Sequence, residues 1–269
     1  MPAMLYVARA ALHMWEEPSI SGTRGSGTIF FSGCSLGCSF CQNREISRGR
    51  SGKAVTTERL SEMMLELEGE GAHNINLVTA THYSPTVIEA VRAAREHGLR
   101  IPIVYNTSSY ESIEPLKSLE GTVNIYLADF KFYKSDTAKK LAGAPDYPDV
   151  ARAAIDEMVR QTGEAVLDAD GMMLRGTVVR ILLLPGHVAE AKLTLKYLYD
   201  TYGDKIFISL MNQYTPMENM SSPLDRTVTR EEYRQLTDYA VRLGVKNAYV
   251  QEGKTASESF IPAFDCEGV

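Results

Sequence analysis

The sequence predicts an α/β fold: a partial (β/α)6 barrel of the TIM type, built on a parallel sheet. Three observations predict it. Apolar, β-branched runs recur along the chain, amphipathic segments of helical period lie between them, and glycines end those segments. Strands that alternate with helices form right-handed βαβ units and a parallel sheet. Six units are two short of a closed eight-unit barrel, so we expect an open barrel, with a doubly wound sheet as the alternative.

The expected strands are apolar runs of the kind that a parallel sheet buries on both faces. They lie at Gly27–Ser32, Ile75–Thr79, Ile101–Tyr105, Val123–Ala128, Thr177–Leu184 and Lys205–Met211. A further edge strand is expected at Asn247–Gln251. In either architecture the active site belongs at the carboxyl ends of the strands, so the polar residues that follow them are the candidates for function.

The expected helices are amphipathic and close at glycine. They lie at Thr57–Gly69, Ser84–Gly98, Val150–Gly163, Val188–Gly203 and Thr229–Gly244. Ser84 is expected to be the N-cap of the second helix, with Pro85 at its first position. A capping box joins Thr229 to Glu232 at the start of the last helix.

The chain has 269 residues, of which 44% are hydrophobic and 23% charged, with a net charge of −6. This composition excludes a disordered chain, and the negative charge predicts no binding to nucleic acid or a membrane surface. No apolar run reaches the ~18 residues of a membrane span. The apolar start, Met4–Trp15, lacks the charged flank of a signal peptide, so we expect a cytoplasmic protein. We divide it into an N-terminal extension (1–26), a core barrel (27–216) and a C-terminal helix–strand extension packed on the core (217–269).

Three of the four cysteines lie together after the first expected strand. Cys34, Cys38 and Cys41 follow a C-x3-C-x2-C spacing, whereas Cys266 stands apart and is expected to play no part. Three thiolates are one ligand short of a closed zinc site or a fully ligated cubane cluster, and a [4Fe–4S] cluster held this way keeps one iron open. The alternatives are a zinc site completed by histidine, a redox thiol pair, or free structural cysteines.

With Phe40 before the last cysteine, this motif resembles that of the radical S-adenosylmethionine (SAM) superfamily. Cys41-Gln42-Asn43 is similar to the Cys-His-Asn of activating enzymes for glycyl-radical enzymes such as pyruvate formate-lyase. The segment His13-Met-Trp-Glu-Glu-Pro18 resembles a branch of uncharacterised proteins similar to that activating enzyme. The resemblance implies that SAM binds the open iron and that its reductive cleavage yields a 5′-deoxyadenosyl radical, which abstracts hydrogen from a protein or peptide. It also implies an external one-electron reductant of the flavodoxin or ferredoxin type.

The residues after the second and third strands are candidates for the SAM site. Members of the superfamily usually carry a Gly-Gly-Glu segment after the second strand, and this chain has Thr79 and Thr81 there instead. Asn106 and Thr107 follow the third strand. Asn106 stands where the activating enzymes often have an acid that helps to bind a monovalent cation beside SAM.

Charged residues lie at the next two strands. Asp129-Phe-Lys131 is similar to the Asp-Leu-Lys of the activating enzymes, which implies that Asp129 helps to bind the cation and that Lys131 approaches the SAM carboxylate. Residues two apart on a strand share a face, so both can enter the barrel mouth; a structural ion pair is the alternative. Arg180, a charge inside an apolar strand, needs an anion or a polar cavity, and the resemblance makes SAM its partner. After the sixth strand the activating enzymes carry a histidine near the adenosine, and the resemblance implies that Asn212, Gln213 or Tyr214 takes its place here.

The pair Glu16-Glu17 precedes the barrel and is expected to be a solvated acidic loop; the alternative is that it reaches back to the mouth of the cluster site. Taken together, the candidates predict a radical SAM enzyme of the glycyl-radical-activating type. The alternatives are a radical SAM enzyme acting on a small molecule, and a non-catalytic iron–sulfur protein for electron transfer or sensing.

Overall fold

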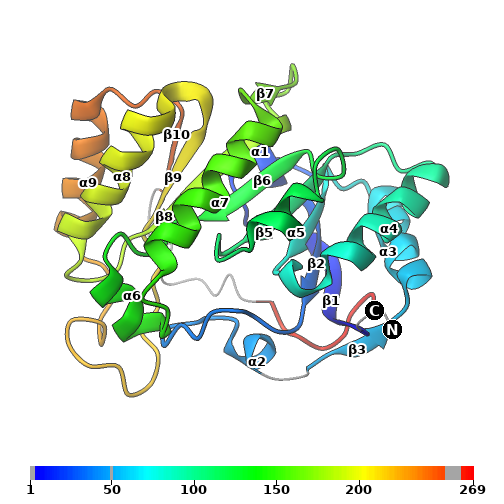
Figure 1. The fold of residues 1–269 in the computed structure, drawn as a ribbon, viewed down its shortest axis with the longest axis horizontal. Coiled ribbons are helices and arrows are strands. Elements are labelled where there is room, and N and C mark those ends of the chain that lie inside the picture. Colours follow the sequence, from blue (N-terminus) through cyan, green and yellow to red (C-terminus); the bar gives the residue numbers. More distant parts are fainter. Residues whose placement is uncertain (1–3, 49–50, 252–261) are drawn as a thin grey trace.

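The computed structural model describes residues 4–48, 51–251 and 262–269. A continuous sheet in the order β10-β9-β8-β6-β5-β4-β2-β1-β3 forms its centre (Figure 1). The strands expected from the six apolar runs all form and pair in parallel. They are β2 (Ser26–Phe31), β4 (Ile75–Val78), β5 (Ile103–Thr107), β6 (Ile125–Asp129), β8 (Met173–Leu182) and β9 (Phe207–Met211). The open partial barrel is confirmed.

Further strands extend this sheet at both edges. β1 (Leu5–His13) pairs antiparallel with β2, and β3 (Lys53–Val55) pairs antiparallel with β1. At the other edge β10 (Ala248–Val250) pairs in parallel with β9, where an edge strand was expected. The short β7 (Val166–Leu167) forms a hairpin with β8. Both extensions therefore contribute strands to the core sheet, and the division at residues 26 and 216 stays a prediction.

Long helices cover the outer face of the barrel (Figure 1). They are α3 (Thr57–Gly69), α4 (Ser84–Glu96), α7 (Tyr147–Thr162), α8 (Val188–Tyr202) and α9 (Arg230–Leu243). The shorter helices are α1 (Pro18–Ser21), α2 (Arg44–Ser47), α5 (Ile113–Lys117) and α6 (Ser135–Ala142), and 3₁₀ turns lie at Thr81–Tyr83 and Gly203–Lys205. Among the described residues, no helix is long and apolar enough to cross a membrane.

The expected helix starts are right at one helix and wrong at another. Thr229 and Glu232 form the capping box of α9 as expected. Ser84, expected as an N-cap, is the first residue inside α4, and Tyr83 precedes it at the cap. The reason is local: the Ser84 hydroxyl donates to the carbonyl of Thr81, so the preceding 3₁₀ turn runs directly into the helix.

The buried apolar residues that the structure describes form one large cluster on the outer face of the sheet and two smaller clusters, one of them on the inner face. On the outer face, side chains such as Tyr105 and Tyr126 are fully buried beneath the helices. On the inner face, Ile20 of α1 packs against Val104, Leu127 and neighbouring residues of the strands. Strand residues alternate between the faces. Asn106 on β5 and Asp129 on β6 are two positions beyond Val104 and Leu127, so they also point into the barrel. α1 thus closes one end of the barrel interior, beneath the carboxyl ends of the strands.

Candidate functional site

A cavity of about 240 Å³ lies at the carboxyl ends of the parallel strands. Among the residues that line it are Cys34, Cys38, Cys41, Thr79, Asn106, Thr107, Asp129, Lys131, Arg180 and Gln213. These residues come from six strand ends that are far apart in sequence. Their convergence follows from the parallel sheet, because the carboxyl ends of its strands meet at one edge. Thr81 does not line the cavity.

The cysteine loop follows β2 and begins at Gly33, whose φ of 97° lies in the region that favours glycine. All three cysteines are free thiols, and Cys38 is buried. Arg48 holds the loop in place, because its guanidinium donates to the carbonyl oxygens of Gly37 and Cys38, both at 3.3 Å. The Leu36 N–H lies 3.4 Å from the Cys34 Sγ. A loop held in this way presents its sulfurs to the cavity.

The donor set fits an iron–sulfur cluster. Burial raises the pKa of the Cys34 thiol and raises that of Cys38 to about 11. Thiolates at these positions therefore need a metal to compensate their charge. Three thiolates can each bind a different iron of a cubane cluster and leave the fourth iron open to an external ligand.

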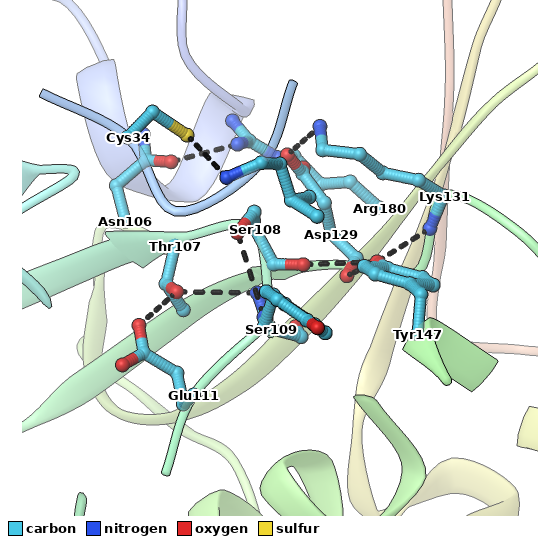
Figure 2. A network of polar contacts seen from close by, with 12 residues as sticks. Cys34, Asn106, Thr107, Ser108, Ser109, Glu111, Asp129, Lys131, Tyr147 and Arg180 are labelled. Atoms are coloured by element: carbon cyan, nitrogen blue, oxygen red, sulfur yellow. Dashed lines mark hydrogen bonds and ion pairs between the residues drawn. The ribbon is translucent and has the colours of Figure 1, made fainter. Parts of the chain in front are cut away.

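A network of charged side chains forms the other wall of the cavity (Figure 2). Arg180 on β8 donates from Nε to Asp129 at 2.7 Å and from Nη2 to the Asn106 Oδ1 at 2.7 Å. The second oxygen of Asp129 accepts from the Lys131 Nζ at 2.6 Å. Both carboxylate oxygens of Asp129 are thus occupied by cationic side chains.

The pKa directions follow from burial and charge pairing. Burial disfavours the charged form of Asp129, but Arg180 and Lys131 outweigh it and lower its pKa. Burial likewise opposes the charge of Arg180, but Asp129 and the acids Glu17 and Glu16 outweigh it and raise its pKa. The three residues at the centre of the network, Asp129, Lys131 and Arg180, therefore stay ionised near neutral pH.

Glu16 and Glu17 do not form the solvated acidic loop that was expected. The Glu16 side chain is 10% exposed, and its carboxylate accepts from Asn76, Asn106 and Arg180 at 3.0 to 3.2 Å. Glu17 is also buried. Burial raises the pKa of both acids, while Arg180 acts in the opposite direction. The physical reason is α1: its docking on the inner face of the sheet carries both acids into the barrel.

The threonines that follow β4 and the threonine that ends β5 have different surroundings. The hydroxyls of Thr81 and Thr107 both donate a hydrogen bond to the Oε1 of Glu111, a buried carboxylate. Thr107 still lines the cavity with part of its side chain. Thr79 adopts a φ of 61°, unusual for a β-branched residue, and its N–H donates to the Asn106 carbonyl. Such strain is often found at functional sites.

Gln213 is held by two other glutamines. Its carbonyl accepts from Gln42 at 3.1 Å, and its Oε1 accepts from Gln251 at 2.9 Å. Gln42 follows the last cysteine directly, so this contact ties the cysteine loop to the end of β9.

Sequence reasoning missed three contributors to the site: Glu16, Glu111 and Tyr147. The Tyr147 hydroxyl is buried and accepts from the Lys131 N–H at 2.9 Å (Figure 2). Glu111 follows a polar strand end, which carries no signal of its own. Glu16 did have a signal, because a buried arginine demands more than one acceptor and few acids precede the barrel.

Comparisons with known proteins agree with this geometry. A family model, the radical SAM superfamily, matches residues 28–198, more than half of the chain. The uncharacterised protein MJ0674 of Methanocaldococcus jannaschii is 24% identical over 252 residues, which cover 91% of this chain and 69% of that protein.

Solved structures share the fold. A radical SAM methyltransferase from Sphaerobacter thermophilus superposes with a TM-score of 0.59 at 17% identity, over 87% of this chain and 68% of the other. The protein anSMEcpe, solved with bound AdoMet and the Cp18Cys peptide, superposes with a TM-score of 0.56 at 13% identity, over 81% of this chain and 60% of the other. This chain thus spans less than two thirds of anSMEcpe, and at these identities the likeness shows the fold alone.

Proposed function

The chain belongs to the radical SAM superfamily, and from that premise we propose an enzyme whose [4Fe–4S] cluster is held by Cys34, Cys38 and Cys41. The cluster and SAM, the cofactors of this superfamily, would supply one-electron cleavage of the SAM sulfonium. The observation that carries the proposal is the cavity, in which three free thiols face a wall of charged side chains. An iron–sulfur protein that only carries electrons has no need of such a wall.

The charged wall suits a ligand with the charges of SAM. Lys131 and Arg180 are the cations of the wall, and a carboxylate that enters the cavity is attracted to both. Lys131 pairs with Asp129 at 2.6 Å and lines the same cavity as the three cysteines. We assign Lys131 and Arg180 to the carboxylate or ribose of SAM. Thr79, Asn106 and Gln213 are the polar groups that complete its pocket.

A protein or peptide is the substrate that we favour, as for an activating enzyme of a glycyl-radical enzyme. The support is Trp15, which lines the cavity and is 58% exposed. Large apolar side chains at the mouth of a polar cavity are typical of surfaces that receive another chain. The external electron donor is of the flavodoxin or ferredoxin type.

Anaerobic reconstitution tests the proposal. We expect about four irons and four sulfides per chain, with release of 5′-deoxyadenosine and methionine when SAM and a strong reductant are added. Alanine at Cys34, Cys38 or Cys41 should abolish the cluster, and the matched variant Cys266→Ala should keep it. Stoichiometric zinc, or a cluster whose spectrum does not respond to SAM, would contradict the proposal.

The substrate class is tested separately. Cell extract of the source organism is divided by size, and each fraction is added to the reconstituted enzyme. We expect the macromolecular fraction to accelerate 5′-deoxyadenosine release and Trp15→Ala to reduce that acceleration without changing the slow release seen with SAM alone. Acceleration by the small-molecule fraction alone would show a small-molecule enzyme.

A further inference from the structure

We propose that Glu16 is a positioning residue for Arg180, so that the segment before the barrel is part of the SAM site. The inference rests on the function proposed above. The proposed function assigns SAM binding to Arg180. We add that Glu16, which precedes the strand–helix units in the chain, fixes the direction in which the Arg180 guanidinium points.

The first step is the set of contacts around Arg180. Its Nε donates to Asp129, its Nη1 to the Glu16 Oε2 at 3.2 Å and its Nη2 to Asn106. These contacts lie on three sides of a planar group whose side chain is 12% exposed. They use three of the five N–H bonds of the guanidinium, and within the described chain the other two are left to a ligand. Without Glu16, the Nη1 group of Arg180 lacks the hydrogen-bond partner that opposes rotation of the guanidinium.

The second step is that Glu16 is itself held on both sides. Its Oε1 accepts from Asn76 and Asn106, while its Oε2 faces Arg180. Asn106 therefore contacts both members of the pair, donating to Glu16 and accepting from Arg180. A closed set of hydrogen bonds of this kind fixes orientation, because no member can rotate without breaking two bonds.

The third step is the anchoring of the segment. The Glu16 N–H donates to the Ser21 hydroxyl at 3.0 Å, and that hydroxyl donates to the His13 carbonyl. Ile20, fully buried, fastens the same turn to the inner face of the sheet. The backbone at Glu16 is thus fixed by α1 and by the end of β1. A carboxylate on a fixed backbone can direct a partner, whereas one on a mobile loop would follow it.

A different pair shows what a structural role looks like. Glu157 and Arg160 on α7 also pair, at 2.8 Å, but the Arg160 side chain is 52% exposed and lies outside the cavity. That pair offers nothing to a ligand. Glu157→Gln is therefore the matched control: it removes a buried glutamate from an arginine at a distance from the site.

A double-mutant cycle on the reconstituted enzyme is the test. The four proteins are the wild type, E16Q, R180K and E16Q/R180K, and the measured quantity is the Kd for SAM, taken from the SAM-induced change in the EPR spectrum of the reduced cluster. A glutamine cannot turn an acceptor toward Asn76 and Arg180 at once. We expect E16Q to raise the Kd about tenfold, ~1.4 kcal/mol, but less than about twofold in the R180K background, because its effect passes through Arg180.

A second measurement reports on Arg180 without SAM. In the full chain before cluster reconstitution, the Nε–H proton of Arg180 is identified by NMR as the signal that R180K removes. We expect E16Q to speed its exchange with water and E157Q to leave it unchanged. This measurement decides the question even where R180K binds SAM too weakly for the cycle.

The outcomes separate this proposal from the one on which it rests. Equal effects of E16Q in both backgrounds, no change in Kd, or an unchanged Nε–H exchange rate would each overturn the positioning role. A wild-type protein that takes up no cluster, or whose cluster ignores SAM, refutes the proposed function instead, and it does so before any variant is made.

Discussion

Asp129 is the residue on which the charges of the cavity converge. It accepts from Arg180 with one oxygen and from Lys131 with the other, and its side chain is 18% exposed. Two cations at such close range would repel each other without the carboxylate between them. Asp129 therefore does more for the site by holding Lys131 and Arg180 in place than by contacting a ligand itself.

Asp129→Asn should lower the free energy of unfolding by about 3–5 kcal/mol, because it leaves the largely buried Lys131 without its carboxylate and Arg180 with Glu16 as its remaining acidic partner. The pH dependence has a definite sign. The pKa of Asp129 is lowered in the folded state, so its contribution is present above the ordinary aspartate pKa of ~3.9 and is lost as the pH falls below it. Urea denaturation of both proteins between pH 7 and pH 2 measures this, because the loss begins near the ordinary pKa and is complete only below the lowered pKa of the folded state. The stability of the wild type should approach that of the variant at acid pH, and a constant difference would contradict the assignment.

At this scale the sequence identifies residues better than it identifies contacts. A mid-strand arginine and an Asp-x-Lys pair after a strand imply charged groups in the barrel mouth, and Arg180, Asp129 and Lys131 are found there. The buried Arg180 signals that a further acceptor is needed, but the sequence could not show that Glu16 supplies it, because the burial of Glu16 depends on how α1 docks on the inner face of the sheet. Nor could it show that Thr81 is bonded to Glu111, thirty residues away.

At the scale of elements, α9 shows how one side chain can fix a helix start and a turn. The Glu232 carboxylate accepts from the Thr229 N–H at 2.9 Å, the Gly186 N–H at 2.7 Å and the Arg226 guanidinium. Gly186 belongs to the turn between β8 and α8. The capping box therefore also ties the last helix to the turn that follows the Arg180 strand.

Glu232→Gln should destabilise the protein by about 1–2 kcal/mol, because it weakens the cap and a charge-assisted bond to Arg226. Urea unfolding measures the loss. The exposed Glu231 on the same turn of helix supplies the control, and E231Q should leave the stability nearly unchanged. Equal losses in the two variants would mean that only the charge near the helix start matters.

Elements with strong periodicity are predictable, and elements made by tertiary contacts are not. α3 has the bounds that its apolar spacing predicts, since Leu60, Met63, Met64 and Leu67 are all buried. The expected strand at Ile101–Tyr105 lies two residues later, as β5, because its register follows β4 and β6. β1 was not predicted: its nine residues become a strand by pairing with β2, and the C-terminal segment completes its surroundings.

At the scale of the whole molecule, the two ends of the described chain meet at β1 (Figure 1). The Cys266 N–H donates to the Ala8 carbonyl, and the Ala10 N–H donates to the Glu267 carbonyl. Arg9, between them, donates to the Ala263 carbonyl and pairs with Asp265 and Glu267. Residues 262–269 thus lie along the strand that continues into the Glu16 segment. They also reach the site, since Pro262 lines the cavity.

Arg9→Gln should loosen this C-terminal segment. Arg9 contacts three residues of this segment: Ala263, Asp265 and Glu267. The Arg9 side chain is 18% exposed, so solvent screens its ion pairs less than it screens pairs at the surface. A loss of about 1 kcal/mol corresponds to a fall in Tm of about 2–4 °C for a chain of this size.

Limited proteolysis separates this effect from a general loss of stability. Cleavage should appear near the C-terminus before any cleavage in the barrel, because the residues that Arg9 bonds there lose their anchor while the sheet remains paired. Lys53→Gln, which removes a single contact to the Val269 carbonyl at 2.9 Å, is the milder control. Phe264 packs on Phe30, a cavity residue, at 5.5 Å between ring centroids. The Kd for SAM should therefore also rise in R9Q and stay unchanged in K53Q. Early C-terminal cleavage with an unchanged Kd would show that the segment stabilises β1 without shaping the site.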